Sequence, residues 1–365
     1  MMGLTWVRVG CGMDASTPAD LLKSDYCFQH DQDLSIVAII PLHNGAKWIE
    51  RTIRSVLAQT HAPEELIVVD DGSTDEGPEI VEQLAADHPS ITLVQTANCG
   101  QSAARNYGVE HSASALIALL DQDDLWYPNH LEKLLEPITE HKGLPLGWVY
   151  SDFDDIDGDG QMIARSYIDQ TSLENPKRHL VAVLSQGMVI QPSATLISRK
   201  AFDAIGGFDE SLCGFEDDDL FLRMFRAGFD NIYVAQSTSQ WRIHEASCGA
   251  SDRHDTSLKR YTQKVINLFP DDKWRGIYYA ADLIAPRFIR TWVTLYMRAA
   301  RYKDHRKMRE YAREAIRLLP HLRVGPRLKY GAILTMMRFP LLGHAIVACY
   351  LYSPRHRRFA VRNNR

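Results

Sequence analysis

The feature that most constrains this chain is a short apolar run that ends in a cluster of carboxylates. Residues 115–120 read Ala-Leu-Ile-Ala-Leu-Leu, and Asp121, Asp123 and Asp124 follow them directly. An apolar run of this length is typical of a buried parallel strand, and Pro128 prevents the strand from continuing. In open α/β folds, ligands bind at the carboxyl ends of such strands. The pattern therefore predicts acidic groups at a ligand-binding edge of a sheet.

Two interpretations of this acidic cluster follow from elementary electrostatics. The charges of Asp121 and Asp123 repel each other, and a hard cation such as Mg²⁺ or Mn²⁺, shared with substrate phosphates, would relieve that repulsion. The alternative is a solvated acidic turn, which is the more frequent meaning of an isolated Asp-x-Asp. The rest of the chain decides between the two.

The first part of the chain alternates between strand and helix patterns. Apolar residues at Ile49, Ile53 and Val56, for example, share one face of a helix. This rhythm predicts βαβ units and a mostly parallel sheet. We expect strands at 35–41, 65–70, 91–95, 115–120, 147–152 and 191–198, an acidic loop at 152–159, and helices at 47–60, 78–88, 100–110, 200–205 and 217–227.

Composition fits one large globular domain or two. The 365 residues are 45% hydrophobic and 24% charged. The six cysteines are scattered without a Cys-x-x-Cys pair, which argues against a disulfide framework or a zinc site and favours a reducing, cytoplasmic location. Residues 1–33 show no signal-peptide pattern, and we expect them to form a polar leader.

Charge divides the chain into two regions. Residues 1–250 carry a net charge of −22 and residues 251–365 carry +17. We expect the second region to be helical and Arg-rich, with a helix at 303–319. Its apolar run at 339–352 is too short to span a bilayer and precedes several Arg residues. It therefore either contacts an anionic membrane peripherally or packs on the first region. Nucleic acid is not expected, because no recognition motif is present.

Five blocks occur in order in residues 34–250: Ile39–Asn44, Val68–Asp75, Asn98–Asn106, Leu120–Asp124, and Gly207–Glu210 with Glu216–Leu220. Together they resemble glycosyltransferase family 2, nucleotide-sugar enzymes of the GT-A fold. One block alone is weak evidence, but the ordered set is specific. Neither residues 1–33 nor the basic region 251–365 is covered by the resemblance.

The resemblance implies a fold and an activity. The fold is a Rossmann-like GT-A domain at 34–250. The activity is metal-dependent, inverting transfer of a sugar from a nucleoside-diphosphate sugar, expected to be UDP-linked. The acceptor would be a hydroxyl of a saccharide or a lipid-linked molecule, in cell-surface polysaccharide or glycolipid assembly. We expect the protein in the cytoplasm, either free or peripheral at the inner face of the membrane.

The resemblance also implies roles on the donor side. Pro41 and His43 would lie beside the nucleotide, Asp71 would contact the base, Asp121 the ribose and Asp123 the metal. Arg105 could meet phosphate or ribose oxygens with several donors, or form a salt bridge with an Asp of the same cleft. Likewise, Pro41 could simply end a strand, and Asp71 before Gly72 could simply form a turn.

On the acceptor side, the resemblance implies that Asp217 is the general base, with Glu216 and Gln191 nearby. A carboxylate within hydrogen-bond reach can take the acceptor's proton. Four adjacent carboxylates at 216–219 should repel one another and raise at least one pKa. The alternative is that they complement the dipole of a helix.

Residues 240–244, which read Gln-Trp-Arg-Ile-His, resemble the segment that closes the family's active site. His244 would be a ligand of the metal or diphosphate there, or else an ordinary surface or core histidine. Processive synthases of the family carry Gln-x-x-Arg-Trp and several membrane spans. The departure from that order, with no full-length span, favours a single sugar addition.

Two other functions are open at this point. A sugar-phosphate nucleotidyltransferase should show a Gly-rich, Arg-containing loop after the first strand, but residues 41–45 read Pro-Leu-His-Asn-Gly. A non-catalytic nucleotide-sugar binder would not need Asp121, Asp123 and Asp217, all of which are present. The sequence identifies neither the sugar nor the acceptor, and it leaves the oligomeric state open.

Overall fold

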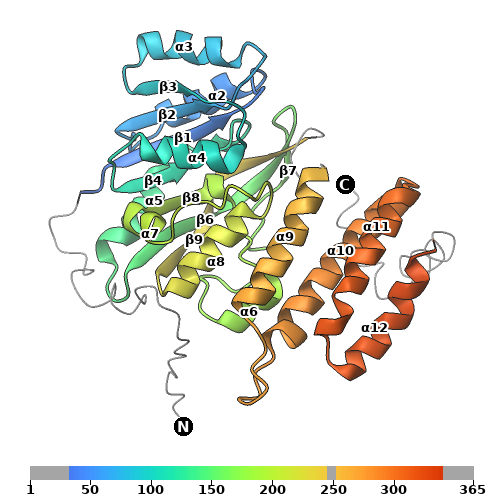
Figure 1. Ribbon diagram of the computed structural model, residues 1–365. Helices are drawn as coiled ribbons and strands as arrows, with labels where there is room; N and C mark the ends of the chain where they lie inside the picture. The colour runs from blue at the N-terminus through green and yellow to red at the C-terminus, as the bar shows by residue number, and fades with distance from the viewer. Residues whose placement is uncertain (1–32, 245–251, 340–365) are drawn as a thin grey trace.

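A computed structural model describes residues 33–244 and 252–339 of the chain (Figure 1). Its centre is a nine-stranded sheet with the order β3-β2-β1-β4-β8-β6-β9-β5, with β7 paired to β6. The expected leader, the domain boundary after residue 250 and the Arg-flanked apolar run from residue 340 lie outside the described residues.

The first part of the sheet has the alternation that the sequence predicts. Strand β1 is buried at all seven positions, and the buried face of α2 carries Ile49, Ile53 and Val56. Strands β1, β2, β3 and β4 pair in parallel. The elements are β1 (Ile36–Leu42), α2 (Ile49–Leu57), β2 (Glu65–Asp70), α3 (Gly77–Asp87), β3 (Ile91–Gln95), α4 (Gln101–Glu110) and β4 (Leu116–Leu119).

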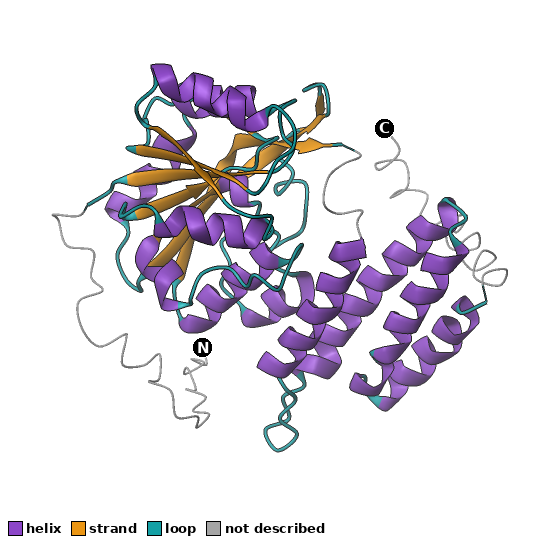
Figure 2. Ribbon diagram, turned by 45° about the horizontal axis from the view of Figure 1, so that its top comes forward, coloured by secondary structure: helices purple, strands orange, loops and turns teal. Residues whose placement is uncertain are grey.

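The second part completes the sheet with strands of both directions. Strand β8 is antiparallel to β4 and β6, β5 and β7 are also antiparallel to their neighbours, and β9 is parallel to β6. Helices lie on both sides of the sheet (Figure 2). The elements are β5 (Leu125–Trp126), α5 (His130–Glu140), β6 (Leu146–Asp157), β7 (Met162–Ala164), α6 (Leu180–Gln186), the 3₁₀ turn η1 (Pro192–Ala194), β8 (Thr195–Ser198), α7 (Arg199–Ala204), α8 (Glu216–Ala227) and β9 (Asp230–Ile243).

Two expectations for this part were wrong. The acidic loop expected at 152–159 is largely strand, because β6 continues to Asp157 in register with β9. The carboxylate of Asp152 accepts the backbone N–H groups of Ile168 and Asp169, so an acidic side chain is satisfied inside the sheet. The strand expected at 191–198 begins only at Thr195, after the 3₁₀ turn η1, where Pro192 lacks the N–H that a ladder needs.

The region after residue 251 is helical, as expected. In its described part, 252–339, the only β pairing is an isolated bridge between Asp272 and Ile277. None of the described helices combines the length and apolar character that crossing a bilayer requires. The elements are α9 (Asp252–Leu268), the π-helical turn η3 (Ala280–Ile284), α10 (Ala285–Arg301), α11 (His305–Arg317), the 3₁₀ turn η4 (Leu319–His321) and α12 (Val324–Met337).

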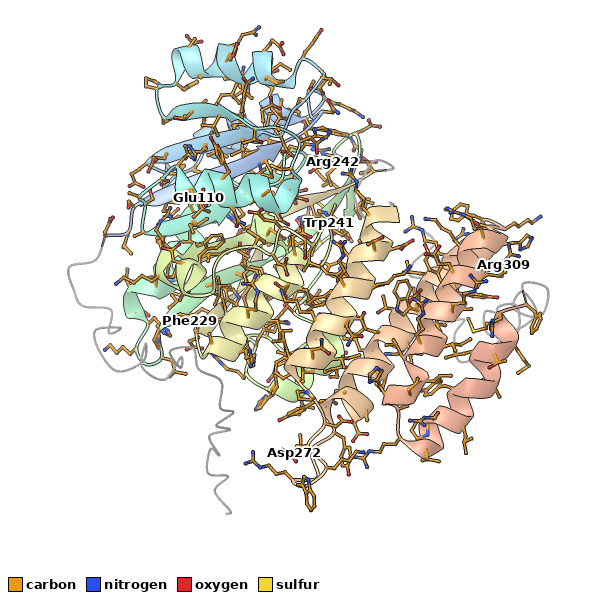
Figure 3. The ribbon with its side chains drawn as sticks, viewed as in Figure 1. Glu110, Phe229, Trp241, Arg242, Asp272 and Arg309 are labelled. Atoms are coloured by element: carbon orange, nitrogen blue, oxygen red, sulfur yellow. The ribbon has the colours of Figure 1, made fainter. Side chains whose placement is uncertain are left out.

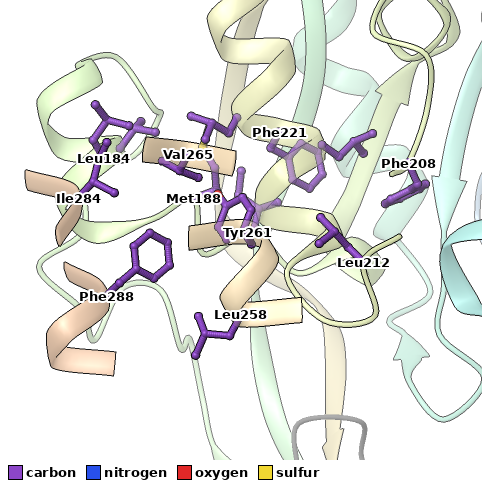
Figure 4. Packing of buried hydrophobic residues seen from close by; sticks show 14 of the residues in the cluster. Leu184, Met188, Phe208, Leu212, Phe221, Leu258, Tyr261, Val265, Ile284 and Phe288 are labelled. Atoms are coloured by element: carbon purple, nitrogen blue, oxygen red, sulfur yellow. The ribbon is translucent and has the colours of Figure 1, made fainter. Parts of the chain in front are cut away.

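The helical region shares a hydrophobic core with the sheet region. Phe221 of α8 and Met188 pack in one cluster with Tyr261 of α9 and Phe288 of α10 (Figure 4). Buried polar contacts cross the same boundary, because the Asp218 carboxylate accepts the Tyr261 hydroxyl at 2.8 Å and pairs with Arg287 at 2.5 Å. Helices α9 and α10 are therefore packed on the sheet region. The alternatives left open for the apolar run at 339–352 are not tested by this packing, because the run from residue 340 lies outside the described residues.

Candidate functional site

The acidic cluster lies in the turn between β4 and β5, and its third member holds that turn together. Asp124 is only 1% exposed. One carboxylate oxygen accepts the Ser193 hydroxyl at 2.7 Å and the Gln191 amide at 3.3 Å, and the other accepts the backbone N–H of Arg242 at 2.8 Å. Burial raises the pKa of Asp124 well above its ordinary value. Asp124 is thus committed to internal contacts, and it ties Gln191 to the cluster.

Arg242 on β9 fixes the same turn from the other side. Its Nε donates to the carbonyl oxygen of Asp123 at 2.7 Å, and its Nη1 donates to the carbonyls of Asp157 at 3.1 Å and Gly158 at 3.4 Å. Figure 3 labels Arg242 and Trp241 near the end of β9. Arg242 has no predicted role of its own from the sequence. The available signal was that it is the middle residue of 240–244, which resembles the family's closing segment.

Asp123, in the turn after β4, and His244, directly after β9, form a close pair. The His244 Nε2 lies 2.7 Å from the Asp123 Oδ2, with the side chains 12% and 20% exposed, and the Trp48 ring lies 4.3 Å from the imidazole ring. Burial, followed by the charge of Asp121, raises the pKa of Asp123, and His244 opposes this rise. These two side chains are the ones that the sequence assigned to the metal, and the fold brings them into contact across 121 residues.

This pair has the chemistry of an incomplete metal site. A carboxylate oxygen and an imidazole nitrogen are both common ligands of divalent cations. Among the described residues there is no group of three or more His, Cys, Asp or Glu side chains that could hold a metal ion. A cation bound by Asp123 and His244 would therefore complete its coordination with water or substrate oxygens. Open positions of this kind suit a cation that acts on a substrate.

Arg105 on α4 connects the acidic turn after β4 with the first turn of α8. It is 1% exposed, and its guanidinium lies 2.5 Å from an Asp121 oxygen and 3.2 Å from a Glu216 oxygen. The Gln101 amide donates to the same Asp121 oxygen at 3.0 Å. The salt bridge that the sequence left open as an alternative for Arg105 is thus present. Contact of Arg105 with a phosphate or ribose stays a prediction.

The first turn of α8 holds the four adjacent carboxylates in different environments. Glu216 pairs with Arg105, Asp218 with Arg287, and Asp219 with Arg223 and Lys264. Asp217 makes no ion pair with any described residue. Its Oδ1 accepts the N–H of Asp218 at 2.8 Å. Burial, then the charges of Glu216 and Asp218, raise the pKa of Asp217 to about 8, against the opposing effect of Arg105.

The loops after β1 and β2 bring the expected nucleotide residues together. Pro41 lies in buried β1 opposite Val69, and the His43 Nδ1 lies 3.0 Å from the Asp71 carbonyl oxygen. The His43 N–H also donates to the Gln122 side chain at 2.8 Å, which links this loop to the acidic turn. The sequence therefore placed His43 and Asp71 at one edge of the sheet correctly. Pro41 does not end the strand as expected, because β1 continues in register with β2 to Leu42. Contacts of these residues with a nucleotide stay predictions.

Asp71 has an internal structural role. Its two carboxylate oxygens accept the backbone N–H groups of Cys99 and Gly100, each at 2.8 Å, and it is 4% exposed. These contacts order the loop that precedes α4. Gly72 follows with a φ of 74°, a conformation that glycine adopts without a steric cost. The turn-forming alternative for Asp71 is thus part of the structure.

Comparisons with known proteins identify the family of this domain. Residues 37–206 match the sequence model described as glycosyl transferase family 2. An uncharacterized glycosyltransferase of Nostoc sp. is 37% identical over 145 residues, covering 40% of this chain and 42% of the relative. An uncharacterized glycosyltransferase of Rickettsia typhi is 33% identical over 213 residues, 57% of this chain and 64% of the relative.

A third relative has a named activity. Chondroitin synthase of Escherichia coli is 30% identical over 189 residues, which covers 52% of this chain and 26% of the relative. The chain thus covers less than two thirds of the length of each of these three relatives.

Solved structures share the fold over a longer stretch. Staphylococcus aureus TarS 1–349 in complex with UDP-GlcNAc matches with a TM-score of 0.60 at 15% identity, covering 87% of this chain and 91% of that one. The mannosyltransferase PcManGT of Pyrobaculum calidifontis, in complex with GDP-Man and Mn²⁺, matches with a TM-score of 0.52 at 20% identity, covering 91% and 89%. At these identities the likeness shows the GT-A fold alone. Residues 37–206 therefore belong to glycosyltransferase family 2, and the named relatives and the shared fold agree with this assignment.

Proposed function

We propose that this protein transfers a sugar from a nucleoside-diphosphate sugar to an acceptor hydroxyl with inversion at the anomeric carbon. The proposal rests on the ion pairing and the pKa of Asp217. It is the one carboxylate of the α8 cluster without an ion pair among the described residues, and its pKa is raised to about 8. A base of this strength suits proton removal near neutral pH. Through Glu216 and Arg105, the same cluster is joined to Asp121.

The proposed reaction is a single displacement. The acceptor oxygen forms a bond to C1 of the sugar as the bond from C1 to the diphosphate oxygen breaks, and the diphosphate leaves with the electron pair. Asp217 takes the acceptor's proton. A divalent cation held by Asp123 and His244 would supply electrostatic stabilisation of the charge that develops on the diphosphate. Asp121 and Arg105 position the donor-side turn. Glu216 pairs with Arg105 next to Asp217, and Gln191 donates to Asp124; we assign both Glu216 and Gln191 to the acceptor side.

The substrates follow from the relatives only as a class. Complexes of fold relatives with UDP-GlcNAc and with GDP-Man and Mn²⁺ support a nucleotide-sugar donor and a divalent cation. We propose UDP as the nucleotide and a saccharide or lipid-linked saccharide as the acceptor, in cell-surface polysaccharide or glycolipid assembly. We assign contact with the inner face of an anionic membrane to the Arg-rich sequence after residue 339, which lies outside the described residues.

The donor site is tested by metal-dependent binding of UDP. In Mn²⁺, UDP at one hundred times its Kd should stabilise the wild-type protein by about 2.7 kcal/mol, and chelation should remove this effect. Asp123→Ala should lose the Mn²⁺-dependent part of the stabilisation by UDP, because its carboxylate is the proposed link to the cation. Its melting temperature without ligand should change little. Asp87→Ala, at an exposed position on α3, serves as the matched control.

Equal UDP affinity in Mn²⁺ and in chelator would contradict the metal assignment. A panel of nucleoside diphosphates and nucleotide sugars in the same melting assay identifies the donor. If no member of the panel stabilises the wild-type protein, the proposed function itself is wrong.

A further inference from the structure

A basic groove runs along α11 on the side that faces α9. It is an open recess of about 500 Å³, lined by Lys259 of α9 and one face of α11. The arginines recur at helical spacing, so successive turns of α11 present them along one line. The cations in the groove wall are Lys259, Arg306, Arg309, Arg313 and Arg317. Figure 3 labels Arg309 on α11.

The acidic residues of the groove form ion pairs with basic residues of the same groove. Glu310 and Glu314 belong to the lining, but Lys259 lies 2.8 Å from the first and 3.5 Å from the second, and Arg317 pairs with Glu314 at 2.8 Å. Arg309 and Arg313 are exposed, and neither makes an ion pair with a described residue. The groove therefore keeps an excess of positive charge directed towards solvent.

The groove is connected by direct contacts to the helix that carries the proposed base. The Phe215 ring, which precedes Glu216 and Asp217, lies 4.9 Å from the His254 ring in the first turn of α9. The next residue, Asp255, accepts the Tyr311 hydroxyl at 2.8 Å and lies 3.6 Å from Lys307, both on α11. The first turns of α8 and α9 and the first two turns of α11 thus follow one another in space, and the groove continues along α11 from that end.

We propose that this groove binds the acceptor, and that the acceptor is an extended polyanion with phosphate or carboxylate groups along its chain. The proposal rests on the function proposed above, since only a transferase has an acceptor. The planar guanidinium group of arginine binds both phosphate and carboxylate groups through paired hydrogen bonds. A repeating anion matches a row of arginines, and a recess between two helices admits a chain, whereas a bilayer presents a broad surface.

The experiment measures binding of the full-length protein to labelled inorganic polyphosphate and to polyglutamate by fluorescence anisotropy at two salt concentrations. R309E/R313E reverses the two unpaired charges, and we expect it to weaken both interactions by about tenfold or more and to flatten the salt dependence. The matched control is R226E/R275E, which makes the same change of charge at exposed arginines of α8 and the α9–α10 loop. It should retain wild-type affinity within about twofold, since neither arginine lines the groove.

Each alternative result has a defined meaning. The groove assignment is overturned if R309E/R313E binds both polyanions as the wild type does, or if the control loses as much affinity. Loss of binding to phosphatidylglycerol vesicles in R309E/R313E, with polyphosphate binding unchanged, overturns the groove assignment in favour of a membrane.

UDP-dependent melting in Mn²⁺ is measured in parallel. A wild type that binds polyphosphate but no nucleotide overturns the acceptor assignment by removing the proposed function, whereas intact UDP binding with no groove effect overturns the groove alone.

Discussion

At the residue scale, the environment of Asp217 predicts a pH dependence of turnover. The ionised carboxylate takes the acceptor's proton, and burial beside like charges raises its pKa to about 8. Turnover should therefore rise by about tenfold per pH unit below about pH 8 and level off above it. Asp217→Asn should lower kcat by roughly two orders of magnitude or more and remove this rise, while the Kd for UDP stays the same.

The thermal stability of Asp217→Asn shows whether a loss of turnover comes from unfolding. The folded-state pKa of Asp217 lies above its ordinary 3.8, so between about pH 4 and pH 8 the unfolded chain has released a proton that the folded chain retains. Ionisation therefore opposes folding as the pH rises through this window. Asp217→Asn should melt no earlier than the wild type at pH 7.5. Near-normal turnover in this variant would place the base elsewhere, with Glu216 or Asp219 as the next candidates.

At the scale of elements, Arg242 joins the end of β9 to the turn after β4 and to the end of β6. Lysine keeps the charge but cannot donate to three carbonyl oxygens in this planar arrangement. Arg242→Lys should destabilise the protein by about 1–3 kcal/mol, because partly buried carbonyls lose their donors. It should also weaken Mn²⁺-dependent UDP binding, because the Asp123 backbone is no longer held.

Urea unfolding and UDP titration measure these two effects. Arg165→Lys, at an exposed position after β7, is the matched control and should change neither quantity. If Arg242→Lys equals that control in both assays, the turn is held by Asp124 and the strand pairing without help from the guanidinium.

At the scale of the whole molecule, the shared core predicts that the sheet region needs α9 and α10. A chain that ends at residue 251 loses Tyr261 and Phe288, and their partners Met188 and Phe221 would meet water. Each large apolar side chain exposed costs about 1.5–3 kcal/mol, and loss of Arg287 would leave the Asp218 carboxylate buried without its cation. Together these losses are comparable with a total stability of about 5–15 kcal/mol.

Circular dichroism and thermal melting of the two shortened chains decide this point. The chain ending at residue 251 should lack a cooperative transition, whereas a chain ending at residue 339, which keeps α9 to α12, should melt close to the full-length protein. A soluble, cooperatively folding protein that ends at residue 251 and binds UDP would show that the sheet region is an independent domain.

The sequence by itself determined the elements whose signals are local. Apolar runs of strand length gave β1, β2, β3 and β4 to within a residue or two, and the helical spacing of Ile49, Ile53 and Val56 gave the buried face of α2. The order of the motif blocks indicated the GT-A fold and the family, which the comparisons confirm. Because parallel strands bring their carboxyl ends to one edge, the grouping of His43, Asp71 and Asp121 could also be anticipated.

Tertiary structure alone decided what these side chains contact. Arg105 could serve a phosphate or an ion pair as far as the sequence showed, and its partners Asp121 and Glu216 lie 16 and 111 residues away. The aspartates of β6 suggested a loop because carboxylates rarely enter a sheet. They are tolerated because folding brings backbone donors such as the N–H of Ile168 and Asp169 to Asp152. A local pattern records only the preferences of near neighbours, whereas the energy of a buried charge depends on donors and counter-charges that arrive with the fold.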